Sequence, residues 1–170
     1  MKKLLLITLL ALLYFSCENN PAVIGSTINP EGESSDIVVG NTDHQQIWID
    51  YIDAHNERDL DKIAEINADD WKGYAPNGNI IEDSDTHIEF LDEWFSSPAN
   101  PRWRVKWMIA NKGTDVEDVM QEWLTTGNDI TFIDEEGNEI VENHVHDIMF
   151  ENGKIKNIFI YSRSAPVSTE

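Results

Sequence analysis

The sequence predicts an α+β domain in which three N-terminal helices pack on a strongly curved, mostly antiparallel sheet. Between about residues 46 and 96, apolar side chains recur every three or four positions, which is the period of amphipathic helices. After residue 102 the period changes to two, which is the period of strands with one buried face. A block of helices followed by a block of strands is typical of the α+β class.

Three helices are expected, over residues 46–58, 60–67 and 85–96. Asp59 precedes the second helix, and Asp83 or Ser84 precedes the third. Side chains of these types accept a hydrogen bond from a free backbone N–H in the first helical turn. Pro98 and Pro101 prevent the third helix from continuing, because proline lacks a backbone N–H and its ring clashes with the preceding turn.

Strands are expected at residues 71–75, 79–81, 102–109, 116–126 and 130–133, and in a C-terminal pair within 139–163. The first two form a small hairpin across the turn-forming residues 76–78. The strand at 102–109 is expected to keep one apolar face, made by the alternate residues Trp103, Val105, Trp107 and Ile109.

The C-terminal hairpin places polar side chains among apolar ones. On the strand before its turn at 151–154, alternate residues share one face: Ile140, Glu142, His144, His146, Ile148 and Phe150. A polar group on an apolar face must be solvated, hydrogen-bonded or functional, because burial without a partner is costly. We therefore expect a pocket between the first helix and the last two strands.

Composition limits the function classes. A chain of 170 residues with 41% hydrophobic content is expected to form one domain with one core. The formal charge of −20 repels phosphate backbones and anionic lipid surfaces, so nucleic acid is excluded as an expected partner.

The N-terminus predicts export. Lys2 and Lys3 precede the apolar run 4–15, which is too short for a stable transmembrane helix but suits a secretory signal. Cys17, the single cysteine, follows Ser16 at the end of this run and resembles the lipid-accepting cysteine of a bacterial lipoprotein. We expect a lipid-anchored protein of the bacterial cell envelope, facing the outer membrane or the periplasm, which contacts the membrane only through that anchor. A secreted protein without a lipid is the alternative.

The expected domain organisation follows from these signals. It comprises a signal peptide at 1–16, the lipidated cysteine and a flexible linker at 17–41, the folded domain at 42–163 and a tail at 164–170. The linker assignment rests on a composition rich in Asn, Pro, Gly, Ser and Thr. In the alternative, an arm around Ile37–Val39 docks on the domain.

Three local strings carry a resemblance to a known superfamily: Glu57–Ile63 (ERDLDKI), Ala68–Trp71 (ADDW) and Asn152–Ile155 (NGKI). From about His44 to Arg163 the chain resembles the nuclear transport factor 2-like superfamily, which includes SnoaL-like polyketide cyclases and ketosteroid isomerase. The resemblance implies a cone-shaped fold with an internal cavity, and a homodimer formed through the outer face of the sheet. Fold alone does not assign chemistry in this superfamily.

The resemblance to ketosteroid isomerase can be followed residue by residue. Tyr51 falls on its tyrosine, and His146 falls on its hydrogen-bond-donating acid. Ala75, followed by Pro76, stands where that enzyme has its catalytic aspartate. The resemblance therefore implies two hydrogen-bonding positions without the base that moves the proton.

Binding of a small, largely apolar molecule without turnover is the first functional hypothesis, and no cofactor or metal is expected. The expected ligand-binding residues are Tyr51, His55, Trp71, Glu142, His144, His146 and Ile158. A lyase, isomerase or cyclase that uses Tyr51 and His146 as an acid–base pair is the second hypothesis, and an oligomerisation module is the third. Two other interpretations stay open: that Tyr51 and His146 are only hydrogen-bonded core residues, and that Glu142, His144 and His146 bind a metal.

Overall fold

The computed structural model describes residues 21–115 and 117–165. Within these residues the helices are α2 (Asp43–Glu57), α3 (Leu60–Ile66) and α4 (Ser84–Ser96). The strands are β1 (Val23–Ile28), β2 (Ser34–Val39), β3 (Asn67–Tyr74), β4 (Ile80–Ile81), β5 (Arg102–Thr114), β6 (Met120–Ile133), β7 (Glu139–Glu151) and β8 (Lys154–Ser164). The predicted signal peptide, Cys17 and the end of the C-terminal tail lie outside the described residues.

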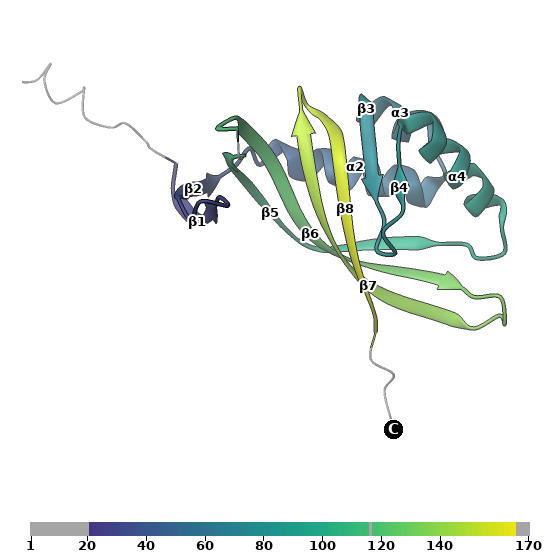
Figure 1. Ribbon diagram of the computed structural model, residues 1–170. Helices are drawn as coiled ribbons and strands as arrows, with labels where there is room; N and C mark the ends of the chain where they lie inside the picture. The colour runs from purple at the N-terminus through teal and green to yellow at the C-terminus, as the bar shows by residue number, and fades with distance from the viewer. Residues whose placement is uncertain (1–20, 116, 166–170) are drawn as a thin grey trace, which may run out of the picture.

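The strands form one curved sheet in the order β1-β2-β5-β6-β7-β8-β3-β4. All neighbours are antiparallel except β3 and β8, which run parallel. The three described helices cover one face of this sheet (Figure 1). The predicted α+β class, with helices on a curved and mostly antiparallel sheet, is confirmed.

Capping side chains begin the shorter helices where the sequence predicts. Asp59 accepts a hydrogen bond from the backbone N–H of Lys62 at 2.9 Å at the start of α3. Asp83 accepts one from Thr86 at 2.7 Å at the start of α4. Helix α2 ends at Glu57 and is capped by Arg58, whose left-handed backbone (φ 66°) lets its N–H donate to the carbonyl oxygens of Ala54 and His55.

Strand β6 differs from the prediction because it runs without a break through Gly127 and Asn128. A Cβ on Gly127 would lie 2.2 Å from Nε1 of Trp107. This glycine therefore permits the indole of the neighbouring strand to lie against the backbone, and it does not form a turn. One long strand consequently replaces the two that were expected at 116–126 and 130–133.

A β-bulge at Lys106 reverses the faces of β5. Val105 pairs with Asn128 and Trp107 pairs with the adjacent Gly127, so Lys106 has no partner in the β5–β6 ladder. Trp103 and Val105 pack on the core, as expected. The prediction that Trp107 and Ile109 share their face is wrong, since the extra residue turns both outward, where they are 43% and 51% exposed.

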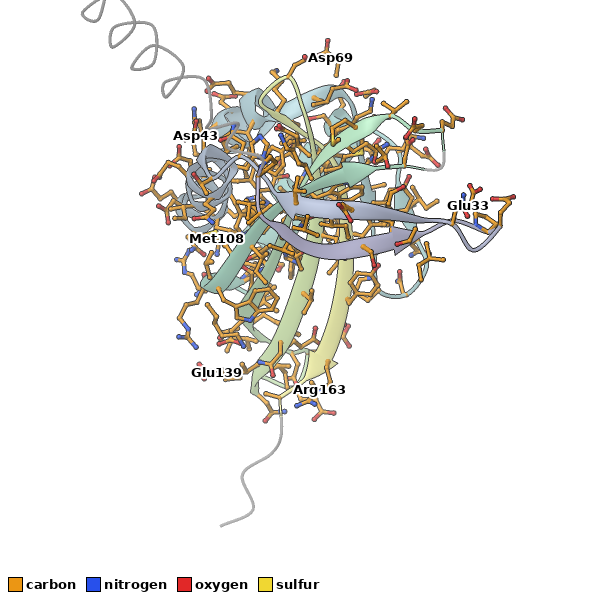
Figure 2. All side chains as sticks on the ribbon, turned by 90° about the vertical axis from the view of Figure 1, so that its left-hand side faces the viewer. Glu33, Asp43, Asp69, Met108, Glu139 and Arg163 are labelled. Carbon is orange, nitrogen blue, oxygen red and sulfur yellow. The ribbon has the colours of Figure 1, made fainter. Side chains whose placement is uncertain are left out.

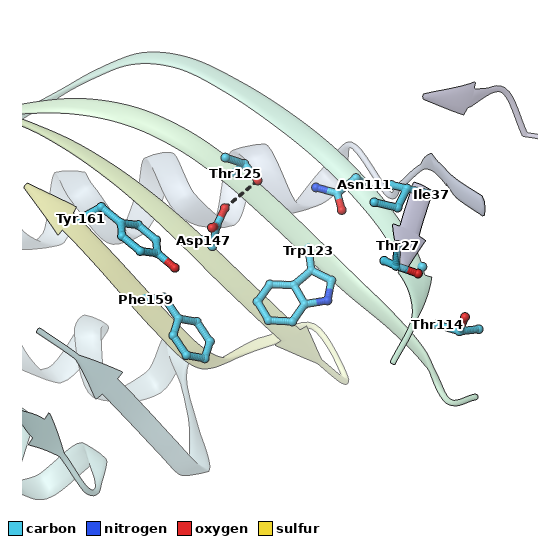
Figure 3. A pocket seen from close by; sticks show the side chains of 10 residues that line it. Thr27, Ile37, Asn111, Thr114, Trp123, Thr125, Asp147, Phe159 and Tyr161 are labelled. Carbon is cyan, nitrogen blue, oxygen red and sulfur yellow. Dashed lines mark hydrogen bonds between the residues drawn. The ribbon is translucent and has the colours of Figure 1, made fainter. Parts of the chain in front are cut away.

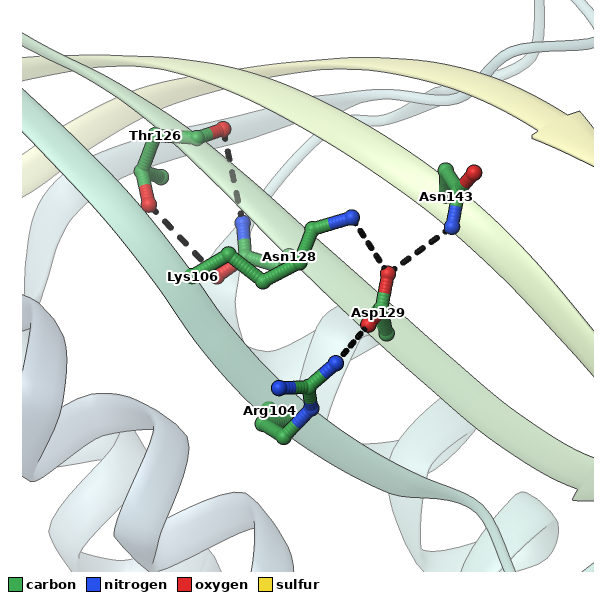
Figure 4. A network of polar contacts seen from close by, with 6 residues as sticks. All are labelled: Arg104, Lys106, Thr126, Asn128, Asp129 and Asn143. Atoms are coloured by element: carbon green, nitrogen blue, oxygen red, sulfur yellow. Dashed lines mark hydrogen bonds and ion pairs between the residues drawn. The ribbon is translucent and has the colours of Figure 1, made fainter. Parts of the chain in front are cut away.

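Charged residues lie around this bulge on the outer face of the sheet. Asp129 on β6 pairs with Arg104 and, at 2.6 Å, with Lys106, and it accepts a hydrogen bond from Asn143 at 2.8 Å (Figure 4). Lys106 and then Arg104 hold the pKa of the Asp129 carboxyl below its usual value. The cluster links β5, β6 and β7 next to the irregular position.

The N-terminal segment differs from the linker expectation over residues 23–39. These residues form a β1–β2 hairpin, and β2 joins the sheet through the pairs Val38–Lys112 and Val39–Asn111. Figure 2 shows the hairpin tip at Glu33 extending from the body of the domain. The alternative of an arm docking around Ile37–Val39 agrees with this pairing, because the apolar residues there continue the edge of the sheet.

The core lies between the helices and the inner face of the sheet. It includes Trp48 and Tyr51 of α2, Leu91 of α4, and Ile148 and Phe150 of β7. Strand β7 keeps its alternation, so His146 is buried with this core whereas Val145 faces outward. Among the described residues, no helix combines the length and apolar character that crossing a bilayer requires.

Candidate functional site

A cavity of about 240 Å³ lies between α2, α4 and the inner face of the sheet, and we call it the central cavity. Six of the seven predicted ligand-binding residues line it: Tyr51, His55, Trp71, His144, His146 and Ile158. Glu142 does not lie on its wall but forms a hydrogen bond with His144. The sequence prediction thus locates this cavity, since alternate residues of β7 and one face of α2 meet there.

Tyr51 anchors the helical wall of the central cavity. Its hydroxyl donates to Oδ1 of Asn67 at 3.0 Å, and Nδ2 of Asn67 donates to Ser84 at 2.9 Å. Burial raises the pKa of the Tyr51 phenol far above its usual value, whereas the bond to Asn67 opposes this rise. The phenol is therefore neutral, and its proton is already engaged by the protein.

Two histidines on the helices are held neutral by burial. Nδ1 of His55 donates to the carbonyl oxygen of Tyr51 at 2.7 Å, because a carbonyl can only accept. Burial lowers the pKa of His55 to about 4. Burial, and then the neighbouring His55, lower the pKa of His87 to about 3. His87 also stacks on Trp71, with ring centroids 4.3 Å apart.

His146 belongs to a second buried chain of hydrogen bonds. The indole N–H of Trp48 donates to Oδ1 of Asn128 at 3.3 Å, which fixes the orientation of that amide because an indole can only donate. Nδ2 of Asn128 therefore donates to Nδ1 of His146, at 3.2 Å. Burial lowers the pKa of His146 to about 3, so the ring is neutral and carries its proton on Nε2.

Two buried donors on residues that line the central cavity have no partner among the described residues. They are Nε2 of His146 and Nε1 of Trp71, on side chains that are 4% and 2% exposed. The indole N–H of Trp71 approaches the Tyr51 oxygen but does not reach hydrogen-bonding geometry. A buried donor without an acceptor costs about 1–3 kcal/mol, so both groups favour an acceptor atom inside the cavity.

Glu142 and His144 form a separate pair. Nε2 of His144 lies 2.9 Å from Oε2 of Glu142. The carboxylate accepts this hydrogen bond and thereby orients the ring. When His144 is neutral, this bond leaves Nδ1 as a free acceptor. The ring of His144 lies 5.6 Å from that of His146. The Glu142–His144 pair therefore lies close to the buried donor of His146.

The position that would hold a carboxylate base is apolar. Ala75 and Pro76, the pair that the resemblance to ketosteroid isomerase puts in place of its aspartate and proline, line the central cavity. His146 does not replace this base, because its Nδ1 lone pair is occupied by Asn128 and its Nε2 carries the proton. Across residues 21–115 and 117–165, no group of three His, Cys, Asp or Glu side chains is arranged to hold a metal ion.

Sequence patterns missed the amides that organise the site. Asn67 stands where a helix end was expected and instead begins β3, while Asn128 lies in the stretch that was interpreted as a break between strands. Both are 2% exposed or less. The sequence signal for both is weak, since Asn67 follows the last residue of a helical pattern and Asn128 stands between Gly127 and Asp129, and both settings are common for asparagine in turns.

Comparisons with known proteins agree with the fold described above. Residues 48–158 match the sequence profile of the SnoaL-like domain. None of the curated proteins compared matches the chain. The family match spans α2 to β8 and leaves the β1–β2 hairpin outside it.

Solved structures share the fold at low sequence identity. A nuclear transport factor 2-like protein of unknown function from Burkholderia pseudomallei has a TM-score of 0.59 and 18% identity, and the alignment covers 72% of this chain and 92% of that one. A candidate ketosteroid isomerase from Kribbella flavida has a TM-score of 0.56 and 14% identity, and the alignment covers 74% of this chain and 81% of that one. A candidate SnoaL-like polyketide cyclase from Shewanella denitrificans has a TM-score of 0.55 and 14% identity, and the alignment covers 72% of this chain and 92% of that one. These likenesses establish the fold alone.

Proposed function

Because the chain belongs to the SnoaL-like domain family, we propose that it binds a small, uncharged and largely apolar molecule in the central cavity without converting it. The observation that carries this proposal is the unpaired donor at Nε2 of His146, a residue that lines the cavity. An acceptor oxygen on the ligand satisfies this donor. The apolar remainder of the ligand packs against the surrounding aromatic and aliphatic side chains.

Charge supports an uncharged ligand. Burial lowers the pKa values of His55, His87 and His146 to about 4, 3 and 3, so these rings are neutral at pH 7. A charged ligand would lose its hydration without gaining a buried counter-charge from them, and this cost is large. The small volume, about 240 Å³, lies below the roughly 300–1,000 Å³ of drug-sized sites and favours a compact molecule.

The absence of turnover is supported at the positions that the resemblance to ketosteroid isomerase marks for proton transfer. Ala75 supplies no base, and both nitrogens of His146 are committed, one to Asn128 and one to its own proton. The hydroxyl proton of Tyr51 is engaged with Asn67. An oligomerisation module is less well supported, because the central cavity is open and not filled by side chains.

The test compares three molecules of similar size: acetophenone, ethylbenzene and benzoate. We expect acetophenone to raise the melting temperature most, ethylbenzene less because it has no acceptor oxygen, and benzoate not at all because it is charged. His146→Ala and Trp71→Phe should reduce the advantage of acetophenone over ethylbenzene. Trp107→Phe, on the outer face, is the control and should keep it.

Two results would contradict the proposal. One is that none of the three molecules changes the melting temperature at any soluble concentration. The other is that benzoate stabilises the protein as strongly as acetophenone, since this would require a positive charge in the cavity.

A second candidate function is favoured by the Glu142–His144 pair. The 2.9 Å bond orients His144 as a proton acceptor, and His146 supplies a donor for a developing negative oxygen. This arrangement suits isomerase, lyase or cyclase chemistry, with His144 in the basic role first considered for His146. Deuterium exchange of the methyl protons of bound acetophenone, abolished in His144→Ala, would favour turnover over binding alone.

Attachment to the bacterial envelope through Cys17 is also a proposal, and it rests on the apolar run before this residue. Metabolic labelling with a fatty acid should label the native chain and place it in the membrane fraction. Cys17→Ser should remain unlabelled and be released from membranes, because a lipid anchor is the only contact that we expect. Equal membrane attachment of both chains would reject the anchor, and the alternative is then a secreted protein.

The homodimer implied by the resemblance is a further proposal. On the outer face of the sheet, Trp107, Ile109 and Val145 are 43%, 51% and 36% exposed, and such apolar surface favours association. Sedimentation should show a dimer that Val145→Glu dissociates. A native chain that is monomeric at every concentration would contradict it.

A further inference from the structure

A second concave site lies on the outer face of the sheet, opposite the central cavity. This outer groove has a volume of about 380 Å³ and is lined by residues of β5, β6, β7 and β8 and by the N-terminal hairpin. Thr27 of β1 and Ile37 of β2 form its hairpin wall. The hairpin precedes the family match at residues 48–158, so the groove requires a segment that is additional to the family domain.

Three aromatic side chains line the outer groove. Trp123 comes from β6, and Phe159 and Tyr161 come from β8. The rings of Trp123 and Phe159 are 6.0 Å apart and tilted by 36°. Tyr74 stacks on Phe159 at 4.3 Å, which holds that ring in place. The faces of aromatic rings attract cations, tryptophan most strongly.

A carboxylate lies among these rings. Figure 3 shows Asp147 of β7 between Tyr161 and Trp123, with Thr125 beside it. The hydroxyl of Thr125 donates to Oδ1 of Asp147 at 2.7 Å, and the described residues offer no ion-pair partner to this carboxylate. Among the described residues that line the groove there is no lysine, arginine or histidine, and Asp147 is the one acidic residue. The formal charge of these residues is therefore negative and has no counter-charge.

We propose that the outer groove binds a small organic cation of the alkylated-ammonium class. The cation lies against Trp123, Phe159 and Tyr161, and its charge is balanced by Asp147. The formal charge of −20 on the whole chain attracts cations to this surface and repels anions. A purely apolar ligand would desolvate Asp147 without supplying a counter-charge, so the carboxylate selects a positive charge.

The test uses choline and its uncharged analogue 3,3-dimethylbutan-1-ol as probes of the full chain. They share shape but differ in charge. We expect choline to shift the tryptophan fluorescence and to bind about tenfold more tightly than the alcohol, since contact with an aromatic ring and a carboxylate contributes on the order of 1–2 kcal/mol. Choline binding should weaken as salt is raised.

Single substitutions test whether choline binds in the outer groove. Asp147→Asn and Trp123→Leu should each weaken choline binding about tenfold, whereas Trp107→Leu, which removes an exposed tryptophan outside the groove, should not change it. Trp71→Phe changes only the central cavity and should bind choline as the native chain does. The failure of this proposal is thereby separated from the failure of ligand binding in the central cavity.

Three outcomes would overturn the proposal. One is equal binding of choline and the alcohol, which would make the groove a general apolar site. Another is unchanged binding in Asp147→Asn. The third is the absence of choline binding together with a dimeric mass, which would mean that a second copy of the chain covers the groove.

Discussion

Buried amides determine what the histidines of the central cavity can do. Oδ1 of Asn128 accepts a hydrogen bond from the indole N–H of Trp48, and its Nδ2 donates one to Nδ1 of His146. The histidine therefore keeps its proton on Nε2. Asn67 receives the Tyr51 hydroxyl and lies 3.4 Å from Nδ1 of His87. Residues that do not line the central cavity thus assign donor and acceptor roles to residues that line it.

Tyr51→Phe is predicted to destabilise the fold by about 1–3 kcal/mol, because Oδ1 of Asn67 loses its donor in a buried site. Urea denaturation measures this change. Tyr161→Phe is the matched control, since Tyr161 is 58% exposed and its hydroxyl can be replaced by water without cost. Equal losses in the two variants would mean that the Tyr51–Asn67 bond contributes nothing.

The buried histidines predict that stability falls with acidity. Their pKa values are about 3–4 in the folded protein and about 6.5 when unfolded, so the unfolded chain binds more protons between these limits. The free energy of unfolding should therefore decrease as pH falls below about 6.5, by about 1 kcal/mol per pH unit for each histidine.

His87→Phe tests this prediction, because a phenyl ring keeps the stacking on Trp71 and removes one titrating group. Urea denaturation at pH 7.5, 6.5 and 5.5 should give a shallower dependence for the variant than for the native chain. An identical slope would show that His87 does not titrate differently in the two states.

Strands β5 and β6 are shaped by one bulge and one close approach. The extra residue Lys106 turns Trp107 outward, and the indole then lies on Gly127. Asp129 holds Lys106 and Arg104 at the same place. A single extra residue therefore places Trp107 and Ile109 on the outer face of the sheet, where both are exposed.

Gly127→Ala is predicted to destabilise the fold by about 1–3 kcal/mol, because the new methyl group would meet the indole at 2.2 Å and displace it. Gly113→Ala on β5 is the matched control, since its Cβ would be 3.5 Å from Ile37, an ordinary contact. Chemical denaturation compares the two. A loss in Gly113→Ala as large as that in Gly127→Ala would contradict this explanation.

For the molecule as a whole, the sheet separates two sites. The central cavity lies between the helices and the inner face, whereas the outer groove depends on the β1–β2 hairpin. The hairpin joins the sheet through two residue pairs with β5 only. Its contribution to the fold is therefore small, although its contribution to the outer groove is direct.

Deletion of residues 23–39 is predicted to leave a domain that still unfolds cooperatively and still responds to acetophenone, because no residue of that segment lines the central cavity. Choline binding should be lost, since Thr27 and Ile37 leave the outer groove. Thermal unfolding with each molecule provides the measurement. Loss of cooperative unfolding would show that the hairpin is part of the folding core.

Periodicity in the chain was sufficient to predict the class, the three described helices and the inner face of β7, because burial on one side of an element repeats with the geometry of that element. It also placed Tyr51, His55, His144 and His146 around one cavity. Such patterns report which side of an element is apolar, and this information is local.

The tertiary structure decided what depends on contacts between distant residues. His146 forms its hydrogen bond with Asn128. The indole of Trp107 occupies the space that a side chain at Gly127 would need. The hairpin at 23–39 pairs with the edge of β5. Each involves a residue whose own neighbours in the chain suggest a turn, a break or a linker. Hydrogen-bond direction, proton position and strand pairing are set by atoms that meet only after folding, so these features follow from the packed arrangement and not from the order of residues alone.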